Sequence, residues 1–257
     1  MLQTIAAVNQ AVNNFIWGVP AMVCIIGVGL LLSVRTGFIQ IRKFPYAIKT
    51  TIGRMFRKRD ASDGAMTPFQ AVCTALAATV GTGNIAGVAG AIAIGGPGAV
   101  FWMWVISFFG MATIYAEATL AQETRVIDPD GTIRGGPVYY ITTAFRGGFG
   151  KFLAGFFAVA IILALGFMGC MVQSNSIGAT MQTAFGIPSW IIGLVLVAIC
   201  AFIFLGGVQR LASVTEKVVP IMAAVFLVGG LIVLIARIKY VPETIGLIFK
   251  YAFEPHA

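Results

Sequence analysis

An uncharged run from Ala75 to Gly90 sets the architecture of this chain; it has the sequence Ala-Leu-Ala-Ala-Thr-Val-Gly-Thr-Gly-Asn-Ile-Ala-Gly-Val-Ala-Gly. The run lies in an apolar stretch long enough to cross a bilayer, whose hydrocarbon core of about 30 Å takes about 20 helical residues. Gly81 and Gly83 flank Thr82 in its middle. Because glycine costs about 1 kcal/mol relative to alanine in a helix, this pattern favours local unwinding inside the span.

Unwound backbone within a membrane lines a cavity or is buried in protein, because its freed N–H and C=O groups need partners. Such a break exposes N–H groups at the positive end of the outer half-helix, which suit a carboxylate. It also exposes carbonyls at the end of the inner half-helix, which suit a small cation such as Na⁺. The alternative interpretation is a stripe for close helix packing, since small residues recur at Gly83, Gly87, Ala91 and Gly95. Both interpretations are compatible, because the stripe starts where the break ends.

The composition of the whole chain identifies an integral membrane protein. Hydrophobic residues make up 59% and charged residues 10% of the 257 residues, against roughly 45–50% and about 25% in an average soluble domain. No charged residue occurs between Gly64 and Ala116, or between Phe152 and Gln209. A water-soluble surface cannot be built from such stretches.

Proline, glycine and charged residues divide the chain into six expected spans within a single transmembrane domain. The spans are 13–34, 68–94, 98–121, 152–183, 189–208 and 218–236. Lys and Arg are concentrated in alternate connections, with 14 of the 17 on one side. By the positive-inside rule, those connections face the cytoplasm, and both ends of the chain lie on the outer side of the plasma (inner) membrane. The net charge of +8 is thus a topological signal and predicts no nucleic-acid partner.

Polar residues inside the spans are the remaining candidates for function. Gln173 in the fourth span is costly without a partner, so it faces protein or a cavity; an interhelical hydrogen bond is the structural alternative. Glu117, the only acid inside an expected span, lies near the cytoplasmic end, where it can reach water or a basic loop. The single histidine, His256, is the penultimate residue, so a His-based catalytic dyad is excluded and no enzyme activity is predicted.

Several blocks of this sequence resemble the alanine/glycine:cation symporter family, also called sodium:alanine symporters. They keep the family's order over roughly 65–185, and they are Gly81-Thr-Gly-Asn-Ile-Ala-Gly-Val88, Gly95-Gly-Pro-Gly-Ala99, Phe101-Trp-Met-Trp104, Glu117-Ala-Thr-Leu-Ala-Gln122 and Gly135-Gly-Pro-Val-Tyr-Tyr-Ile141. The resemblance implies a LeuT-type fold, in which two inverted five-helix repeats each open with a broken helix. Here one extra N-terminal helix precedes the first repeat, and the second repeat is absent.

The resemblance also implies roles for individual residues. The amides of Thr82 and Gly83 receive the substrate carboxylate, and Asn84 helps to hold the site. Gln173 matches a substrate-contacting glutamine of the family. The carbonyls of two further residues, Ala77 and Val80, form the first repeat's share of a Na⁺ site.

The function expected from the resemblance is sodium-coupled symport of a small neutral amino acid, alanine or glycine, by the N-terminal half of a carrier. H⁺ remains an alternative coupling ion. Half of a pseudo-symmetric carrier cannot alternate access alone, so the expected partners are the C-terminal repeat or a second chain, besides the lipid bilayer. The alternative from another class is a non-transporting membrane module or an inactive truncated product.

Overall fold

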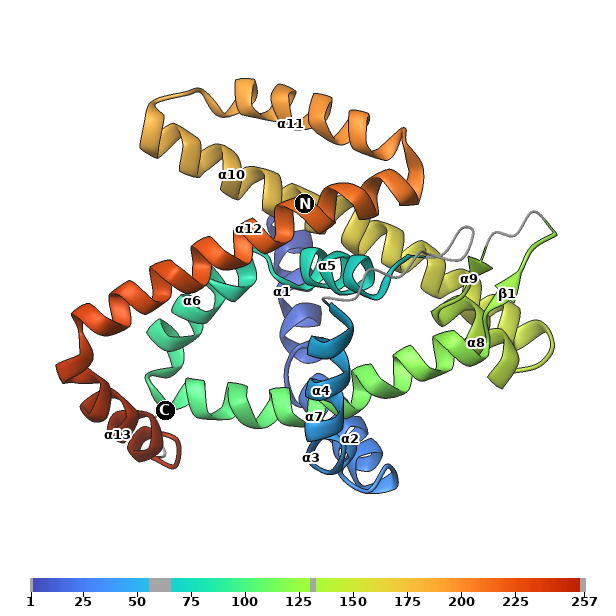
Figure 1. The fold of residues 1–257 in the computed structure, drawn as a ribbon, viewed down its shortest axis with the longest axis horizontal. Coiled ribbons are helices and arrows are strands. Elements are labelled where there is room, and N and C mark those ends of the chain that lie inside the picture. The colour runs from blue at the N-terminus through green and yellow to red at the C-terminus, as the bar shows by residue number, and fades with distance from the viewer. Residues whose placement is uncertain (1, 56–65, 130–132, 255–257) are drawn as a thin grey trace.

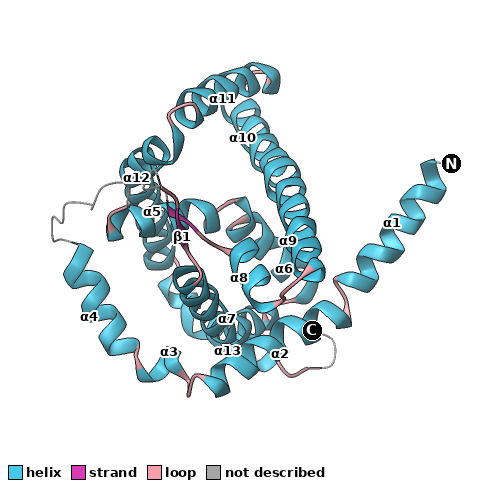
Figure 2. Ribbon diagram, turned by 90° about the vertical axis from the view of Figure 1, so that its right-hand side faces the viewer, coloured by secondary structure: helices cyan, strands magenta, loops and turns pink. Residues whose placement is uncertain are grey.

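The computed structural model describes residues 2–55, 66–129 and 133–254, and it is almost entirely helical (Figures 1 and 2). Four basic or titratable residues lie outside the described residues: His256 and, in the connection between the first two expected spans, Arg57, Lys58 and Arg59. The helices are α1 (Leu2–Ile16), α2 (Val19–Arg35), α3 (Ile39–Arg42), α4 (Phe44–Met55), α5 (Pro68–Thr79), the 3₁₀ turn η1 (Thr82–Asn84), α6 (Ala86–Gly95), α7 (Gly98–Glu123), α8 (Pro137–Ala144), α9 (Gly148–Ile161), the π-helical segment η2 (Ile162–Gly169), α10 (Cys170–Phe185), α11 (Ser189–Phe204), α12 (Gly207–Ala236), the 3₁₀ turn η3 (Ile238–Tyr240) and α13 (Val241–Tyr251).

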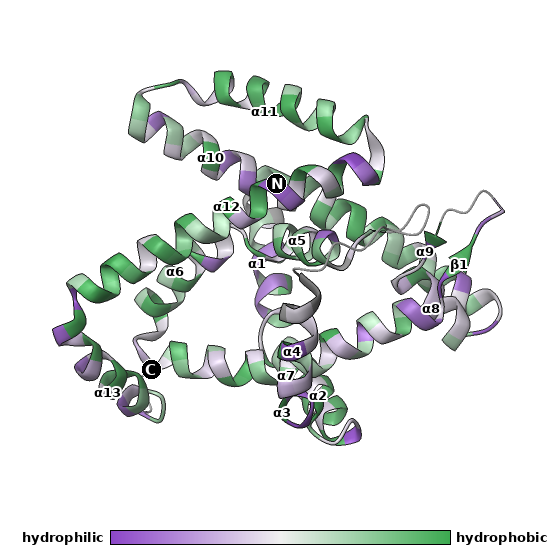
Figure 3. Cartoon of the chain, viewed as in Figure 1, coloured by the Kyte–Doolittle hydropathy of each residue, from purple (hydrophilic) through white to green (hydrophobic). Residues whose placement is uncertain are grey.

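Four stretches of helix are long and apolar enough to cross a membrane: Ala6–Arg35, Gly98–Glu123, Gly148–Phe185 and Gly207–Ala236. The bent pair α5 and α6 adds a fifth if the two halves are counted as one span, whereas α11 is shorter, at 16 residues. At most 6% of the most apolar window of any of the four is buried within the chain. Figure 3 shows hydrophobic residues along most of α11 and α12. Such exposed apolar helices are stable only in lipid or against further protein, so this is a multi-pass membrane protein.

Glycine and proline residues form two of the sharp turns between helices, one between α6 and α7 and one between α10 and α11. α6 ends at Gly95, and Gly96 adopts a φ of 70°, which favours glycine, before Pro97 leads into α7. α10 ends in the same way at Gly186, whose φ is 69°, ahead of Pro188. Both turns lie where the sequence predicts helix ends.

The boundary between the last two long helices differs from the sequence-based expectation. The basic segment 209–217 was expected to be a connection between spans. It is instead the first part of α12, which begins at Gly207 directly after a short turn. Arg210 stabilises that turn by donating to the carbonyl oxygen of Phe202 at 2.9 Å and lying over the Phe202 ring. Pro220 is accommodated inside the helix. The expected span 218–236 is therefore the C-terminal part of one 30-residue helix.

One small departure from an all-helical chain occurs in the connection after α7. Strands β1 (Val126–Ile127) and β2 (Ile133–Arg134) pair antiparallel, and Arg134 forms an ion pair with Asp128. This hairpin lies at one end of α7, next to α8 (Figure 1). Its two-residue strands leave the architecture all-helical in substance.

Close contacts hold the beginning and the middle of α7. Gly29 of α2 approaches the backbone of Phe109 so closely that a Cβ at position 29 would lie 2.9 Å from the Phe109 Cβ. At the start of α7, Trp102 donates from Nε1 to the carbonyl oxygen of Ala252 at 2.9 Å. The Trp102 ring also meets Phe253 edge to face. The end of the α13 segment is thereby held against the beginning of α7 (Figure 2).

Candidate functional site

The span that contains Gly81 and Gly83 is broken. α5 ends at Thr79, Val80 and Gly81 are extended, η1 makes a single 3₁₀ turn, and α6 continues at 68° to the first half. Glycine on both sides of Thr82 lowers the cost of leaving the α-helix, so the local sequence and the local geometry agree. The helix is therefore interrupted around Thr82, as the first interpretation of the glycine pattern predicts.

Backbone groups on both sides of the break are released from helix pairing. The Asn84 amide donates to the Gly81 carbonyl at 3.1 Å, which closes the 3₁₀ turn. In the described part of the chain, the amides of Gly81 and Gly83 and the carbonyls of Ala77, Ala78, Thr79 and Val80 have no hydrogen-bond partner. The break thus offers amide donors on either side of Thr82 and four consecutive carbonyl acceptors on its inner side. A carboxylate suits the first and a hard cation suits the second.

Gln173 of α10 reaches this break from 91 residues further along the chain. Its Oε1 accepts a hydrogen bond from the Thr82 amide at 3.3 Å, and its Nε2 lies 2.7 Å from where a Cβ on Gly81 would stand. Two residues singled out separately from the sequence, Thr82 and Gln173, are brought together. The contact is also the interhelical hydrogen bond expected from the structural interpretation of Gln173, and it is made to the break itself.

The small-residue stripe finds no close partner within the described residues. Nothing lies within 4 Å of a Cβ built on Gly83 or Gly87, and Gly95 meets only Ala99 of the following helix. Ile94 at the far end of α6 is 91% exposed. The outer half of the broken span therefore presents a face that no described helix of this chain covers.

The inner half of the broken span is held by polar contacts that the sequence analysis did not identify. Gln70 donates from Nε2 to Oε2 of Glu216 in α12 at 2.9 Å, and the hydroxyls of Thr74 and Thr215 lie 3.2 Å apart. Between them Cys73 is only 2% exposed. We call these contacts the polar seam; its residues are Gln70, Thr74, Thr215 and Glu216. The i, i+4 spacing of Gln70 and Thr74 on one helix face is the sequence signal that could have indicated it.

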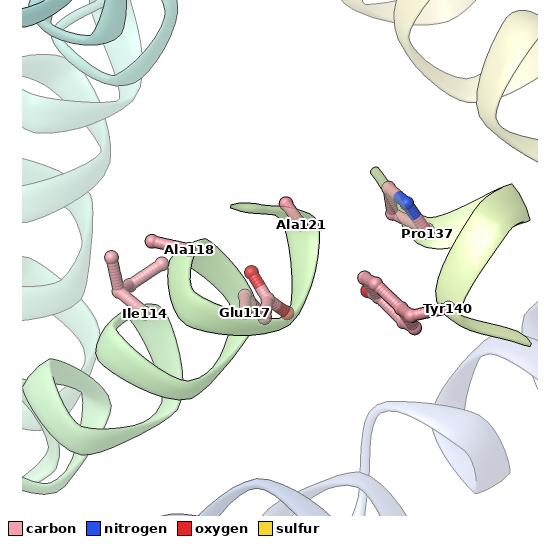
Figure 4. A pocket seen from close by; sticks show the side chains of 6 residues that line it. All are labelled: Ile114, Glu117, Ala118, Ala121, Pro137 and Tyr140. Carbon is pink, nitrogen blue, oxygen red and sulfur yellow. The ribbon is translucent and has the colours of Figure 1, made fainter. Parts of the chain in front are cut away.

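Glu117 lies at a different place from the break. It lines a cavity of about 290 Å³ between α7 and α8, where its side chain faces Tyr140 (Figure 4); the remaining lining residues are Ile114, Ala118, Ala121 and Pro137. Burial raises the pKa of the Tyr140 phenol above its usual value, and the Glu117 carboxylate adds to the rise. Among the described residues Glu117 forms no ion pair, so the basic-loop contact considered from the sequence is not seen there.

No group of three or more His, Cys, Asp or Glu side chains gathers in the described parts of the chain to hold a metal ion. Backbone oxygen atoms are suitable ligands for Na⁺ but not for a transition metal. The free carbonyls of Ala77 and Val80 fit that chemistry.

Comparison of the sequence with known proteins indicates the family of this chain. The model of the family described as "Sodium:alanine symporter family" matches residues 2–257. The "Sodium/alanine symporter AgcS" of Methanococcus maripaludis is 43% identical over 246 residues, which are 95% of this chain and 54% of that protein. The "Putative sodium/proton-dependent alanine carrier protein YrbD" of Bacillus subtilis is 44% identical over 244 residues, 95% of this chain and 48% of that protein.

A relative named for a different substrate is also similar. The "Probable sodium/glutamine symporter GlnT" of Bacillus subtilis is 36% identical over 255 residues, 98% of this chain and 52% of that protein. The chain spans about half the length of the curated relatives it matches. Because the family model matches nearly every residue and the broken span carries the expected pattern, the chain belongs to the sodium:alanine symporter family, a family of transporters and not of enzymes.

Proposed function

We propose that this chain forms the N-terminal half of a Na⁺-coupled symporter that carries a small neutral amino acid, alanine or glycine, across the plasma membrane. The observation that carries the proposal is the break between α5 and α6, where unpaired amides and unpaired carbonyls lie within one span. Glutamine is the alternative substrate, because one of the relatives is named as a probable glutamine symporter.

In this proposal the substrate carboxylate binds the amides of Thr82 and Gly83. The free Gly83 amide and the positive end of α6 supply the attraction for a negative charge. Asn84 holds the turn, and Gln173 contacts the substrate from α10, a role supported by its position beside Thr82.

The coupling ion binds on the inner side of the break, at the carbonyls of Ala77 and Val80. Two carbonyls are fewer ligands than Na⁺ requires, so the remaining ligands come from the second repeat of a LeuT-type fold. H⁺ is the competing ion, because the name of one relative includes a proton. The concentration of 14 of the 17 Lys and Arg residues in alternate connections supports an orientation with both ends of this chain outside.

Uptake of radiolabelled alanine into proteoliposomes tests the proposal. This chain is reconstituted alone and together with the C-terminal half of the AgcS relative, with and without a Na⁺ gradient, and the two halves of AgcS itself serve as the assembly control. We expect Na⁺-dependent uptake only when a C-terminal half is present. Unlabelled glycine and glutamine as competitors identify the substrate, and an imposed proton gradient identifies the ion.

Two outcomes would contradict the proposal. Uptake by this chain alone would mean that it self-associates into a carrier. An absence of uptake from the hybrid, while the AgcS halves assemble and transport, would favour the alternative of a non-transporting membrane module. The uncovered face of α6 is the feature that favours that alternative.

A further inference from the structure

The contact between Gln173 and the break covers two successive residues. The Oε1 atom takes the Thr82 amide, while Nε2 stands where a side chain on Gly81 would begin. Gly81 has φ −138° and ψ −166°, an extended conformation open to any residue. Glycine at position 81 is therefore not required by an unusual φ, and the space that the Gln173 carboxamide occupies supplies a steric reason for it besides the lower cost of leaving the helix.

The helix that carries Gln173 is irregular immediately before it. The segment η2 is π-helical from Ile162 to Gly169, and α10 resumes at Cys170, three residues ahead of Gln173. A π segment turns the chain by a smaller angle per residue than an α-helix, so it changes the face on which the following residues lie. The π segment thereby contributes to the direction in which Gln173 projects.

The Thr82 amide is one of the two groups to which the proposed function assigns the substrate carboxylate. A neutral carboxamide oxygen accepts a hydrogen bond from it. An ionised carboxylate is the stronger acceptor, since charge-assisted hydrogen bonds are about twice as strong as neutral ones. Substrate can therefore displace the carboxamide, which leaves Gln173 free beside the bound molecule.

We propose that Gln173 is an exchangeable cap on the Thr82 amide and that Gly81 is the positioning residue that admits it. The cap satisfies the exposed amide while the site is empty, and the substrate carboxylate replaces it on binding. This inference rests on the proposed function for the identity of the displacing group, but the contact between Gln173 and the Thr82 amide is observed independently of that function.

Hydrogen exchange of the Thr82 amide, measured on the 257-residue chain in lipid nanodiscs without amino acid, tests the cap directly. Gln173→Ala removes the acceptor, and exchange should become about twofold to tenfold faster, as expected for the loss of one neutral hydrogen bond. Gln173→Glu supplies an ionised acceptor of the same length, and exchange should become slower than in the unaltered chain. These opposite signs are not expected of a residue that merely fills space.

Gly81→Ala tests the positioning role without touching Gln173. The new Cβ would lie 2.7 Å from Nε2, so the carboxamide must move away and the Thr82 amide should exchange as in Gln173→Ala. The matched controls are Gly87→Ala, which meets nothing within 4 Å, and Gln182→Ala on the same helix, whose carboxamide accepts from the Ser189 hydroxyl. Neither control should alter exchange at Thr82.

Exchange in α7 amides shows whether each variant remains folded. If Gln173→Ala unfolds the chain, Gly81→Ala and Gln173→Glu decide the question. Unchanged Thr82 exchange in the folded variants would overturn the cap.

Adding alanine and Na⁺ to the assembled hybrid separates this inference from the proposed function. If Thr82 exchange depends on Gln173 but does not respond to alanine, the cap stands and the substrate site fails. If exchange responds to alanine but not to Gln173, the substrate site stands and the cap fails.

Discussion

Replacing Gln70 with alanine is expected to loosen the inner half of the broken span, because one carboxamide makes two contacts. Its Oε1 accepts from the Thr67 amide at 3.1 Å, which completes the cap of α5, and its Nε2 donates to Glu216 at 2.9 Å. A hydrogen bond to a charged group contributes about 1.5–3 kcal/mol, and a lost cap costs about 0.5–2 kcal/mol. Both contacts are only partly buried, so the low ends apply and the expected loss is about 2 kcal/mol.

A double-mutant cycle isolates the contact between helices from the cap. Gln70→Ala, Glu216→Ala and the double variant of this chain are unfolded in mixed micelles by increasing the fraction of a denaturing detergent, followed by tryptophan fluorescence. The expected coupling energy is about 1–2 kcal/mol. Gln122→Ala, on an exposed turn of α7, is the control and should stay within about 0.5 kcal/mol. A coupling below about 0.3 kcal/mol would refute the role of Gln70 as a tie to α12.

Three further substitutions test other parts of the molecule. Thr82→Pro should abolish alanine uptake by the assembled carrier with little loss of folded protein, because Gly81 already has the extended backbone that proline requires of its predecessor; retained uptake would contradict the carboxylate site. Glu117→Gln should leave the Na⁺ dependence of uptake unchanged, because this residue lines the cavity at α8 and not the break, and a change of coupling ion would disprove that separation. Trp102→Phe should lower the free energy of unfolding by about 1 kcal/mol, because the hydrogen bond to Ala252 is lost; no change in detergent unfolding would show that this bond is not stabilising.

The sequence predicted those features that depend on neighbouring residues. Long uncharged stretches indicated a membrane protein, and the glycines around Thr82 indicated a broken helix, because both properties are local and strongly unfavourable in any other setting. The all-helical class and the sodium:alanine symporter family are confirmed. The inverted-repeat architecture and the roles of individual site residues stay predictions.

Features that depend on distant contacts were not predictable in the same way. The segment 209–217 was assigned to a connection because the charged residues Arg210 and Lys217 interrupt its apolar pattern. Its helical state depends on the turn before it, where Arg210 caps and stacks on Phe202. Gln173 was expected to need a partner. That this partner is Thr82, 91 residues earlier in the chain, depends on how the helices pack and not on neighbouring residues.

The burial of Cys73 between α5 and α12 gives this chain a chemical reporter of its own. Cys24, Cys170 and Cys200 are exposed, whereas Cys73 is covered by the polar seam. A chain in which only Cys73 is retained would resist a thiol reagent while the seam is closed, and it would react once the inner half-helix moves away. The rate of that reaction counts opening events directly, so the motion of the broken span can be timed without attaching any foreign label beforehand.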